Sequence, residues 1–398
     1  MRIVYILLSP TFGMHQYTAD LANRMADGPG GHEVHLVTVQ TFPRDRYAPG
    51  VHLHPVAHAG NSGLALQSLR LDRLRAVGRA ILALAPEVVH FTGPHLWNVP
   101  LVRALRRAGV PVIHSLHDLD PHAGTRLGPL LHVWNRLIMH SAARILVHGE
   151  QYRARLAGLG FAERVAYTPL LHLFLSHANQ AAAHAPNGST PDAPDGERPL
   201  ALFFGRLEKY KGVDNLLAAY AMLGERAPAY RPPAFDLALA GPGELSHFWT
   251  GGLPRGVTLH NGLVEDALAL DLFRRCSLVV LPYVDATQSA LIAAAYFFHK
   301  PVLVTHVGAL PEYVVAGETG FVVEPNHPPS LARALNEAFS DPARLRAMGA
   351  AGRAWYERRR AEELHGLLAL YRECGGESKN EVLGVSPAAC NDYPGRIT

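Results

Sequence analysis

The stretch 203-FFGRLEKYKG-212 joins an apolar run to the start of an amphipathic segment, and it decides the fold prediction. The apolar run, residues 200–204, is typical of a buried strand. Gly205 ends the run and lets the backbone turn without a clash at Cβ. A helical pattern begins at residues 212–217, so the residues between form a loop at the carboxyl end of a strand. Open parallel sheets bind their ligands at such loops.

This loop carries two basic side chains, Arg206 and Lys211. A guanidinium and an ammonium a few residues apart suit the two phosphates of a diphosphate. The 398-residue chain has only four Lys, and two of them, Lys209 and Lys211, lie in this loop. The alternative interpretation is an ordinary solvated charge pair at the start of a helix.

A second segment, 282-PYVDATQS-289, follows another apolar run, 277–281. Pro282 ends that predicted strand, and an apolar helix is predicted over 290–298. The short polar stretch just before this helix consists of Thr287, Gln288 and Ser289. A helix start offers free N–H groups and a partial positive charge, so it suits a phosphate. Ser289 is also a candidate N-cap, and the two roles are compatible.

A third segment begins with a predicted strand over 301–305 and continues into a loop that contains Gly308 and Glu312. Gly308 permits a close approach of the backbone to a ligand. Glu312 is a candidate ligand-binding carboxylate. Its alternative role is that of a helix-start carboxylate, which the helix dipole favours.

In this order and spacing, the three segments resemble the donor-binding half of retaining GT-B glycosyltransferases of group 1, which are family 4-like. The turn 241-GPGE-244 after an apolar strand matches the G-x-G turn of that family. The loop 261-NGLV-264 resembles its base-contacting loop. The resemblance covers roughly residues 1–370 and makes Gly205, Gly241, Gly262 and Val264 candidate donor-binding residues.

The amino-terminal half resembles the same family less sharply. Gly13, after an apolar strand over 2–9, stands where a family glycine approaches the donor phosphates and the acceptor, although the usual Gly-Gly is absent. A strand over 110–115 ends at Leu116-His117-Asp118, which resembles the family's T-x-H-D. The resemblance places His117 beside the sugar being transferred. A hydrogen-bonded core histidine is the alternative.

One departure from the family pattern lies in the segment 282–302. The family has two Glu eight positions apart, one near the transferred sugar and one on the nucleotide ribose. Ala286 and Ala294 occupy those positions here. Asp285 is the candidate replacement for the first Glu, and nothing evident replaces the second.

The resemblance implies an α/β fold of the GT-B type, with two Rossmann-like, doubly wound parallel-sheet domains facing across a cleft. A hydrophobic content of 48% is ample for two cores. The predicted organisation is an acceptor-side domain over 1–175, a linker over 176–199, a nucleotide-sugar-binding domain over 200–341, helices over 342–374 that cross back to the first domain, and a disordered tail over 375–398.

The function implied is transfer of a sugar from a nucleotide-diphosphate sugar to an unknown acceptor (a glycan, lipid or small molecule) with retention of configuration. The catalytic candidates are His117, Arg206, Lys211 and Asp285. Two alternatives remain open: a catalytically weak GT-B protein that binds a nucleotide sugar or partners an active enzyme, and a nucleotide-sugar epimerase of the same fold.

No metal and no cofactor are predicted. Asp118 and Asp120 form a D-x-D pair that could bind Mg²⁺ or Mn²⁺. The family, however, generally stabilises the leaving diphosphate with basic side chains and helix starts, a role that Arg206 and Lys211 fill.

Residues 1–175 carry 17 Arg, no Lys and 10 acidic residues, although the whole chain has a net charge of only +3. Two arginine-rich helical stretches, 70–79 and 103–107, are typical of ordinary solvated helix faces. A peripheral contact with an anionic membrane is the alternative. Nucleic acid is an unlikely partner class, because the basic residues are not interleaved with stacking aromatics. Three Cys at no metal spacing and no apolar run of 20 residues indicate a cytoplasmic protein.

Overall fold

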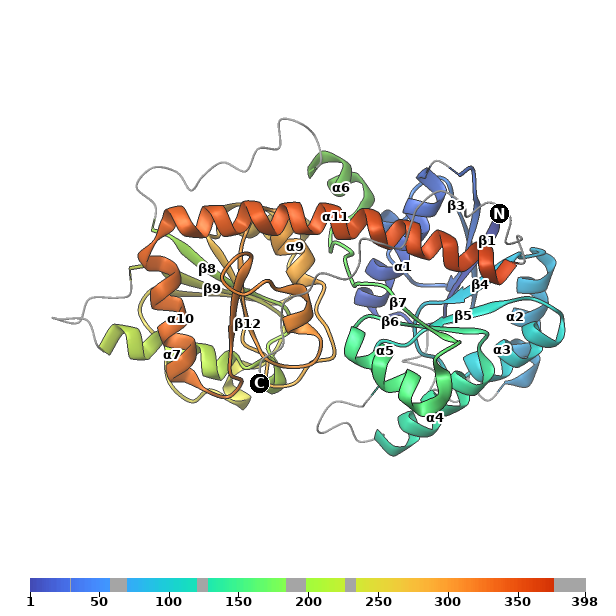
Figure 1. Cartoon of the computed structure of the whole chain (residues 1–398), viewed down its shortest axis with the longest axis horizontal. Helices are drawn as coiled ribbons and strands as arrows, with labels where there is room; N and C mark the ends of the chain where they lie inside the picture. Colours follow the sequence, from blue (N-terminus) through green and yellow to red (C-terminus); the bar gives the residue numbers. More distant parts are fainter. Residues whose placement is uncertain (29, 58–69, 120–127, 184–197, 226–233, 376–398) are drawn as a thin grey trace.

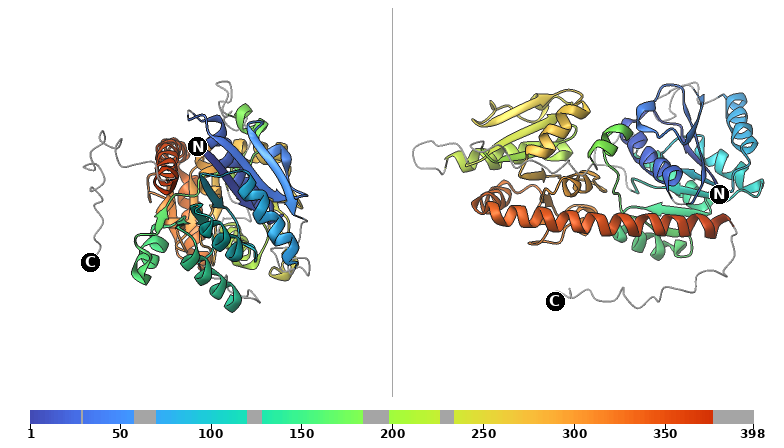
Figure 2. Two further views of the ribbon diagram at one scale, coloured as in Figure 1. Left: turned by 90° about the vertical axis from the view of Figure 1, so that its right-hand side faces the viewer. Right: turned by 90° about the horizontal axis from the view of Figure 1, so that it is seen from above.

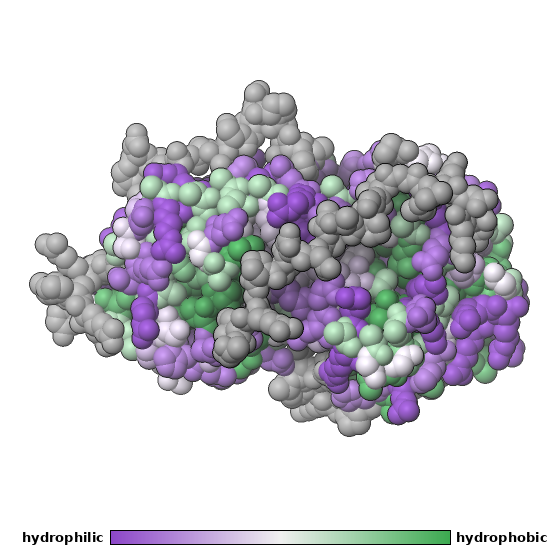
Figure 3. Space-filling view, viewed as in Figure 1, coloured by the Kyte–Doolittle hydropathy of each residue, from purple (hydrophilic) through white to green (hydrophobic). Residues whose placement is uncertain are grey.

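The computed structural model forms two α/β domains joined by a long helix (Figure 1). It describes residues 1–28, 30–57, 70–119, 128–183, 198–225 and 234–375. On the coloured part of the face in Figure 3, hydrophilic side chains are frequent over both domains, with smaller hydrophobic areas between them.

The amino-terminal domain is built on a seven-stranded parallel sheet in the order β3-β2-β1-β4-β5-β6-β7. Its strands are β1 (Arg2–Leu7), β2 (Glu33–Val39), β3 (Val51–Ala57), β4 (Val88–Phe91), β5 (Val112–Ser115), β6 (Arg144–Val147) and β7 (Val165–Tyr167). Central strands such as β4 are buried along their whole length. Such apolar runs are expected where helices cover both faces of a parallel sheet.

The helices of this domain are α1 (Phe12–Asp27), α2 (Leu71–Ala83), α3 (Asn98–Arg107), α4 (Gly128–Ser141) and α5 (Glu150–Leu156), with shorter turns η1 (Arg44–Arg46) and η4 (Ala157–Phe161). Helix α1 begins at Phe12, so Gly13 lies in its first turn. The carbonyl of Thr11 accepts the N–H groups of Met14 and His15, which closes the first turn.

The carboxy-terminal domain has a six-stranded parallel sheet in the order β10-β9-β8-β11-β12-β13. Its strands are β8 (Leu200–Phe204), β9 (Asp236–Gly241), β10 (Val257–Asn261), β11 (Leu278–Leu281), β12 (Val302–Thr305) and β13 (Gly320–Val323). Its helices are α7 (Val213–Glu225), α8 (Asp266–Arg275), α9 (Leu291–Phe297) and α10 (Pro328–Ser340), with the short turns η5 (Lys209–Lys211), η6 (Leu245–His247) and η7 (Leu310–Tyr313). The order changes direction between β8 and β11, where doubly wound sheets bind ligands.

Two helices connect the domains. The predicted linker 176–199 contains helix α6 (His177–Ala183) before it passes out of the described residues. Helix α11 (Pro342–Gly375) runs along both domains, as Figure 1 and the right-hand view of Figure 2 show. The predicted tail lies outside the described residues beyond Gly375.

Helix α11 is anchored in each domain by different residues. Trp355 packs on Tyr296 of α9 at 5.5 Å between ring centroids. In the amino-terminal domain, the Tyr371 hydroxyl lies 2.6 Å from Nδ1 of His90 and 3.1 Å from the Tyr5 hydroxyl. Glu363 accepts Arg24 at 2.6 Å. The helix therefore contributes to both cores.

Candidate functional site

Three predicted glycines lie at the carboxyl ends of adjacent strands. Gly205 and Gly262 follow β8 and β10, and Gly241 is the last residue of β9. All three have positive φ angles, of 132°, 119° and 147° respectively. A Cβ on Gly241 would lie 2.0 Å from the carbonyl oxygen of Gly205. Only glycine allows the backbones after β8 and β9 to approach so closely. The structure therefore brings these three residues together along one edge of the sheet.

Lys211 is held between two tyrosine rings on the loop after β8. Its Nζ lies 3.7 Å from the centroid of the Tyr283 ring and 5.1 Å from that of Tyr210. Burial lowers the pKa of Lys211 to about 8. The rings fix a cation with few waters around it, and such a cation interacts strongly with an added anion.

Arg206 lies more openly on the same loop. Its guanidinium donates to Oε1 of Glu208 at 2.7 Å and to the Tyr210 hydroxyl at 2.9 Å. The side chain of Arg206 is 62% exposed, so its ion pair with Glu208 holds it only weakly. A bound diphosphate can compete for it. Tyr210 contacts both predicted phosphate ligands.

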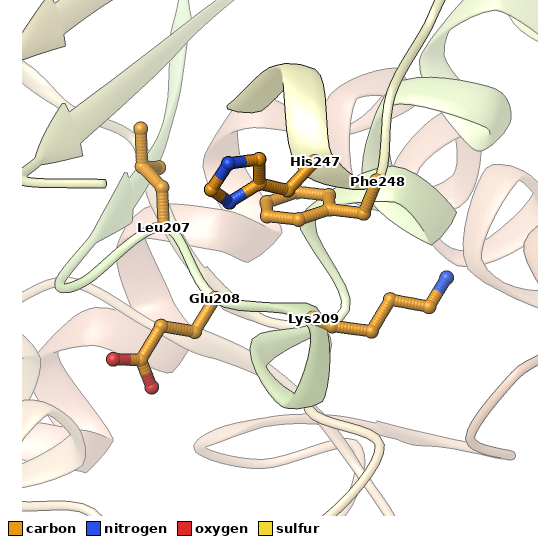
Figure 4. Close-up of a pocket in the computed structure, with 5 residues that line it drawn as sticks. All are labelled: Leu207, Glu208, Lys209, His247 and Phe248. Carbon is orange, nitrogen blue, oxygen red and sulfur yellow. The ribbon is translucent and has the colours of Figure 1, made fainter. Parts of the chain in front are cut away.

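A hollow of about 460 Å³ lies on the outer side of this loop (Figure 4). His247 and Phe248, from η6 and the residue after it, face the stretch Leu207–Lys209. Glu208 and Lys209 point in opposite directions (Figure 4). Lys209 forms an ion pair with Asp214 of α7. Of the two lysines in the loop, Lys211 is therefore the one directed to Tyr283.

The segment after β11 is fixed from several sides. The Val284 N–H donates to the Tyr210 carbonyl at 2.8 Å. This bond joins the segment to the loop 205–212, the predicted phosphate loop. The Ala309 N–H donates to the Thr287 carbonyl at 2.9 Å. A Cβ on Gly308, whose φ is 48°, would lie 1.9 Å from the Ala286 carbonyl oxygen. Glycine is required there because the two loops pack backbone to backbone.

The polar triplet before α9 is arranged differently from an N-cap. Ala290 occupies the cap position and makes no side-chain cap bond. The Ser289 hydroxyl instead lies 3.3 Å from that of Tyr283, so the N-cap interpretation of Ser289 is wrong. Oε1 of Gln288 is buried without a hydrogen-bond partner, and such a group is satisfied when a ligand donates to it.

The two positions where the family has a glutamate are buried in this structure. Ala286 is 7% exposed and Ala294 is 1% exposed, the latter inside packed helix α9. Asp285 is half-buried, and its N–H lies 3.3 Å from the Tyr210 carbonyl. Asp285 therefore stands beside the phosphate loop, whereas the position of Ala294 offers no polar contact to a ribose.

Glu312 lies at the contact between the domains. Its carboxylate accepts the N–H of Glu150 at 2.6 Å and that of Gln151 at 3.1 Å, in the first turn of α5. A Cβ on Gly149 would lie 2.8 Å from the Ala309 Cβ, so the domains touch closely here. Glu312 was predicted to bind the donor nucleotide sugar. Its carboxylate already accepts two hydrogen bonds from the amino-terminal domain.

His117 is a buried, neutral imidazole at the end of β5. Its Nε2–H donates to the carbonyl of Thr92 at 2.9 Å. Its ring packs against Tyr17 at 4.8 Å and His148 at 5.0 Å between centroids. Burial lowers the pKa of His117 below its ordinary value. With Nε2 as the donor, Nδ1 remains the acceptor of the neutral ring.

A hydrogen bond joins the two halves of the site. The Thr287 hydroxyl donates to Oδ1 of Asp118 at 2.9 Å. The Tyr313 hydroxyl donates to the His148 carbonyl at 2.6 Å and accepts the Leu170 N–H at 2.8 Å. These contacts hold His117, the residue before Asp118, close to the loops after β11 and β12.

The remaining predicted residues lie at the margins of the site. Gly13 lies in the first turn of α1, and a Cβ there would meet nothing within 4 Å. Val264 is half-buried against the core below the loop after β10. Tyr210 and Tyr283 were not among the predicted site residues, although both lie inside the segments that identified the site.

Of the D-x-D pair, Asp120 lies outside the described residues. Within the ranges that the structure covers, no three His, Cys, Asp or Glu side chains are grouped to hold a metal ion. In the same ranges, no helix combines the length and apolar character needed to cross a bilayer.

Comparison with known sequences identifies both halves of the chain. Residues 12–170 match the family described as glycosyl transferase 4-like domain, and residues 198–341 match glycosyl transferases group 1. A curated relative from Streptomyces avermitilis, named D-inositol 3-phosphate glycosyltransferase, is 28% identical over 85% of this chain and 78% of its own length. A relative of that name from Catenulispora acidiphila is 29% identical over 74% of each chain.

Comparison with solved structures agrees on the fold. A sucrose-phosphate synthase from Thermosynechococcus elongatus superposes with a TM-score of 0.68 at 20% identity, over 95% of this chain and all of the other. HepE from Anabaena, solved with UDP and glucose, superposes with a TM-score of 0.66 at 16% identity, over 93% of this chain and 99% of the other.

Proposed function

Since the chain belongs to the group 1 glycosyltransferases, we propose that it transfers a sugar from a nucleotide-diphosphate sugar to an acceptor with retention of configuration. The observation that carries this proposal is the desolvated ammonium of Lys211 between two tyrosine rings. It lies at the carboxyl end of β8, next to the point where the strand order changes direction. A diphosphate is the anion that fits beside Lys211 and Arg206.

The basic side chains act on the leaving group. Negative charge grows on the diphosphate as the bond to the sugar breaks, so a fixed cation stabilises the transition state more than the ground state. Lys211 is already fixed by Tyr283 before the ligand binds. Arg206 exchanges its exposed ion pair with Glu208 for the diphosphate.

Retention is proposed to follow a front-face route. Double displacement would need a carboxylate nucleophile beside the sugar. Ala286 stands where the family has a glutamate, so the segment after β11 offers only Asp285 as a candidate nucleophile. The front-face route, which needs no such nucleophile, is therefore favoured. The leaving phosphate then helps to remove the proton of the acceptor hydroxyl, and His117, neutral with Nδ1 as its acceptor, holds a hydroxyl of the transferred sugar.

A second candidate function follows from the closed positions of Ala286 and Ala294. A protein that binds a nucleotide sugar but turns it over weakly would also keep the phosphate ligands. The two candidates agree on donor binding and differ in turnover.

Donor binding is tested by thermal unfolding with a panel of UDP-, GDP- and ADP-sugars. A ligand at 100 times its dissociation constant stabilises the folded state by about 2.7 kcal/mol. We expect one base class to raise the Tm by several degrees and the others to leave it unchanged. Failure of every nucleotide sugar and every nucleoside diphosphate would contradict both candidates.

A peripheral membrane contact is proposed through α2. A largely apolar groove of about 330 Å³ lies between α2 and α3, and Arg75 and Arg79 are among its lining residues. Leu71 is 62% exposed and Leu82 is 40% exposed on the same helix. On α3, by contrast, Arg103 and Arg106 donate to Ser141 of α4. The face of α2 therefore combines basic side chains with exposed apolar ones, as a cytoplasmic enzyme that binds anionic lipid requires.

Membrane binding is tested by sedimentation with vesicles. The chain should bind vesicles rich in phosphatidylglycerol at low salt and release them at high salt. Exchanging Arg75 and Arg79 for Glu should abolish binding and leave the Tm unchanged. Equal binding by the variant, or binding to neutral phosphatidylcholine vesicles, would exclude the α2 face.

A further inference from the structure

The segment after β11 has Ala286 where the family places a glutamate beside the transferred sugar, and the neighbouring Asp285 lies next to Tyr210 of the loop after β8. Ala286 is buried, and its carbonyl packs closely against the backbone at Gly308. This contact fixes the backbone at Ala286. The opposite domain, however, directs a carboxylate to this place. Asp118 Oδ1 accepts the hydroxyl of Thr287, the residue directly after Ala286, at 2.9 Å.

Asp118 is held by its own domain. It follows His117 at the end of β5, and Nδ2 of Asn135 donates to the carbonyls of Asp118 and Leu119 at 2.9 and 3.0 Å. The side chain is half-buried. A carboxylate has about four lone-pair positions, so it can accept several hydrogen bonds at once, the one from Thr287 among them.

The neighbours of Asp118 define what would lie against it. Thr287 contacts Asp118 from the carboxy-terminal domain. The negative charge of Asp118 also acts on the Lys211 ammonium, where burial has the larger, opposite effect on the pKa. His117, the residue before Asp118, presents a neutral imidazole. A group attached to a diphosphate at Lys211 therefore meets a carboxylate and an imidazole, which both accept hydroxyl protons.

We infer that Asp118 is a specificity-determining residue that accepts hydroxyl groups of the transferred sugar, in place of the glutamate missing at Ala286. The inference rests on the proposed function. Since this carboxylate belongs to the amino-terminal domain, recognition of the sugar requires the contact between Thr287 and Asp118, whereas recognition of the diphosphate does not. Sugar binding is thereby coupled to the closed arrangement of the domains.

The test compares two ligands in two proteins. The probes are UDP with UDP-glucose, GDP with GDP-mannose, and ADP with ADP-glucose; the pair that stabilises the wild-type chain most is used. Calorimetry then gives the affinities of the wild-type chain and of Asp118→Asn, which keeps the side-chain shape and an acceptor for Thr287. Asp271→Asn, on the exposed face of α8, is the matched control.

We expect Asp118→Asn to weaken the nucleotide sugar on the order of 10- to 100-fold, the range for hydrogen bonds to a charged group. The diphosphate should bind as well as before or slightly more tightly, because a negative charge near Lys211 is removed. Asp271→Asn should change neither. Equal losses for both ligands, or no loss for either, would overturn the inference and leave the proposed function standing. If no probe binds the wild-type chain, both are overturned together.

Discussion

Lys211→Ala is expected to lower kcat/KM on the order of 10²-fold, by analogy with the loss of one preorganised hydrogen-bond donor. Its ammonium is desolvated beside Tyr283 before the substrate arrives, so little reorganisation is needed when charge develops on the leaving diphosphate. Lys300→Ala is the matched control, since Lys300 lies between α9 and the start of β12, whereas the loop with Lys211 follows the end of β8. Unchanged activity in Lys211→Ala would remove the proposed role of this loop.

The same residue predicts a pH dependence. The pKa of Lys211 is lowered by burial to about 8, so the free enzyme loses this positive charge as the pH rises through about 8. The pH profile of kcat/KM reports groups of the free enzyme. It should therefore fall above pH 8, about two units below the range expected for an exposed lysine. A profile that stays flat to pH 10 would exclude a catalytic ammonium with this pKa.

Truncation after Ala350 is expected to abolish the folded state. It removes the buried side chains Trp355, Tyr356, Leu367 and Tyr371. Burying four large side chains contributes roughly 6–12 kcal/mol, which is comparable with the whole stability of a typical domain. It also removes Arg360, an ion-pair partner of Asp20, whose side chain is only 2% exposed. Asp20 then keeps only the longer ion pair with Arg24 at 3.7 Å, and weaker pairing of a buried charge adds a further cost.

Truncation after Gly376 is the control, because it removes only residues beyond the end of α11. The longer product should be soluble with an unchanged Tm, and the shorter one should aggregate or show no cooperative unfolding. Equal tolerance of both truncations would show that α11 is not part of the two cores.

The sequence was most informative where structure depends on neighbours along the chain. Apolar runs that end at Gly205, Gly241 and Pro282 predicted three strand ends. In the structure Gly205 follows β8, Gly241 is the last residue of β9, and Pro282 follows β11. The GT-B fold prediction is confirmed by the two parallel sheets and by the solved glycosyltransferases. Helix α1 begins at Phe12 although Pro10 and Gly13 favour a loop locally, because its first turn closes on the Thr11 carbonyl.

Contacts between the domains could not be predicted from spacing. Asp118 and Thr287 are 169 residues apart and meet only because two separate sheets direct their carboxyl ends toward each other. The contact of Glu312 with α5 has the same origin. Tyr283, in contrast, stood inside a segment already singled out, and an aromatic residue after a strand, facing a lysine loop, was a signal for a cation site.

Turnover with an acceptor tests the central claim most directly. The chain is incubated with the nucleotide sugar that stabilises it and with sugar-alcohol acceptors, beginning with D-inositol 3-phosphate because of the names of its curated relatives. NMR then follows the anomeric centre of the product. The account predicts equal amounts of nucleoside diphosphate and of a glycosylated product with the anomeric configuration of the donor. An inverted product would contradict the retaining mechanism, and free sugar or an epimerised nucleotide sugar in place of a glycosylated product would contradict transfer itself.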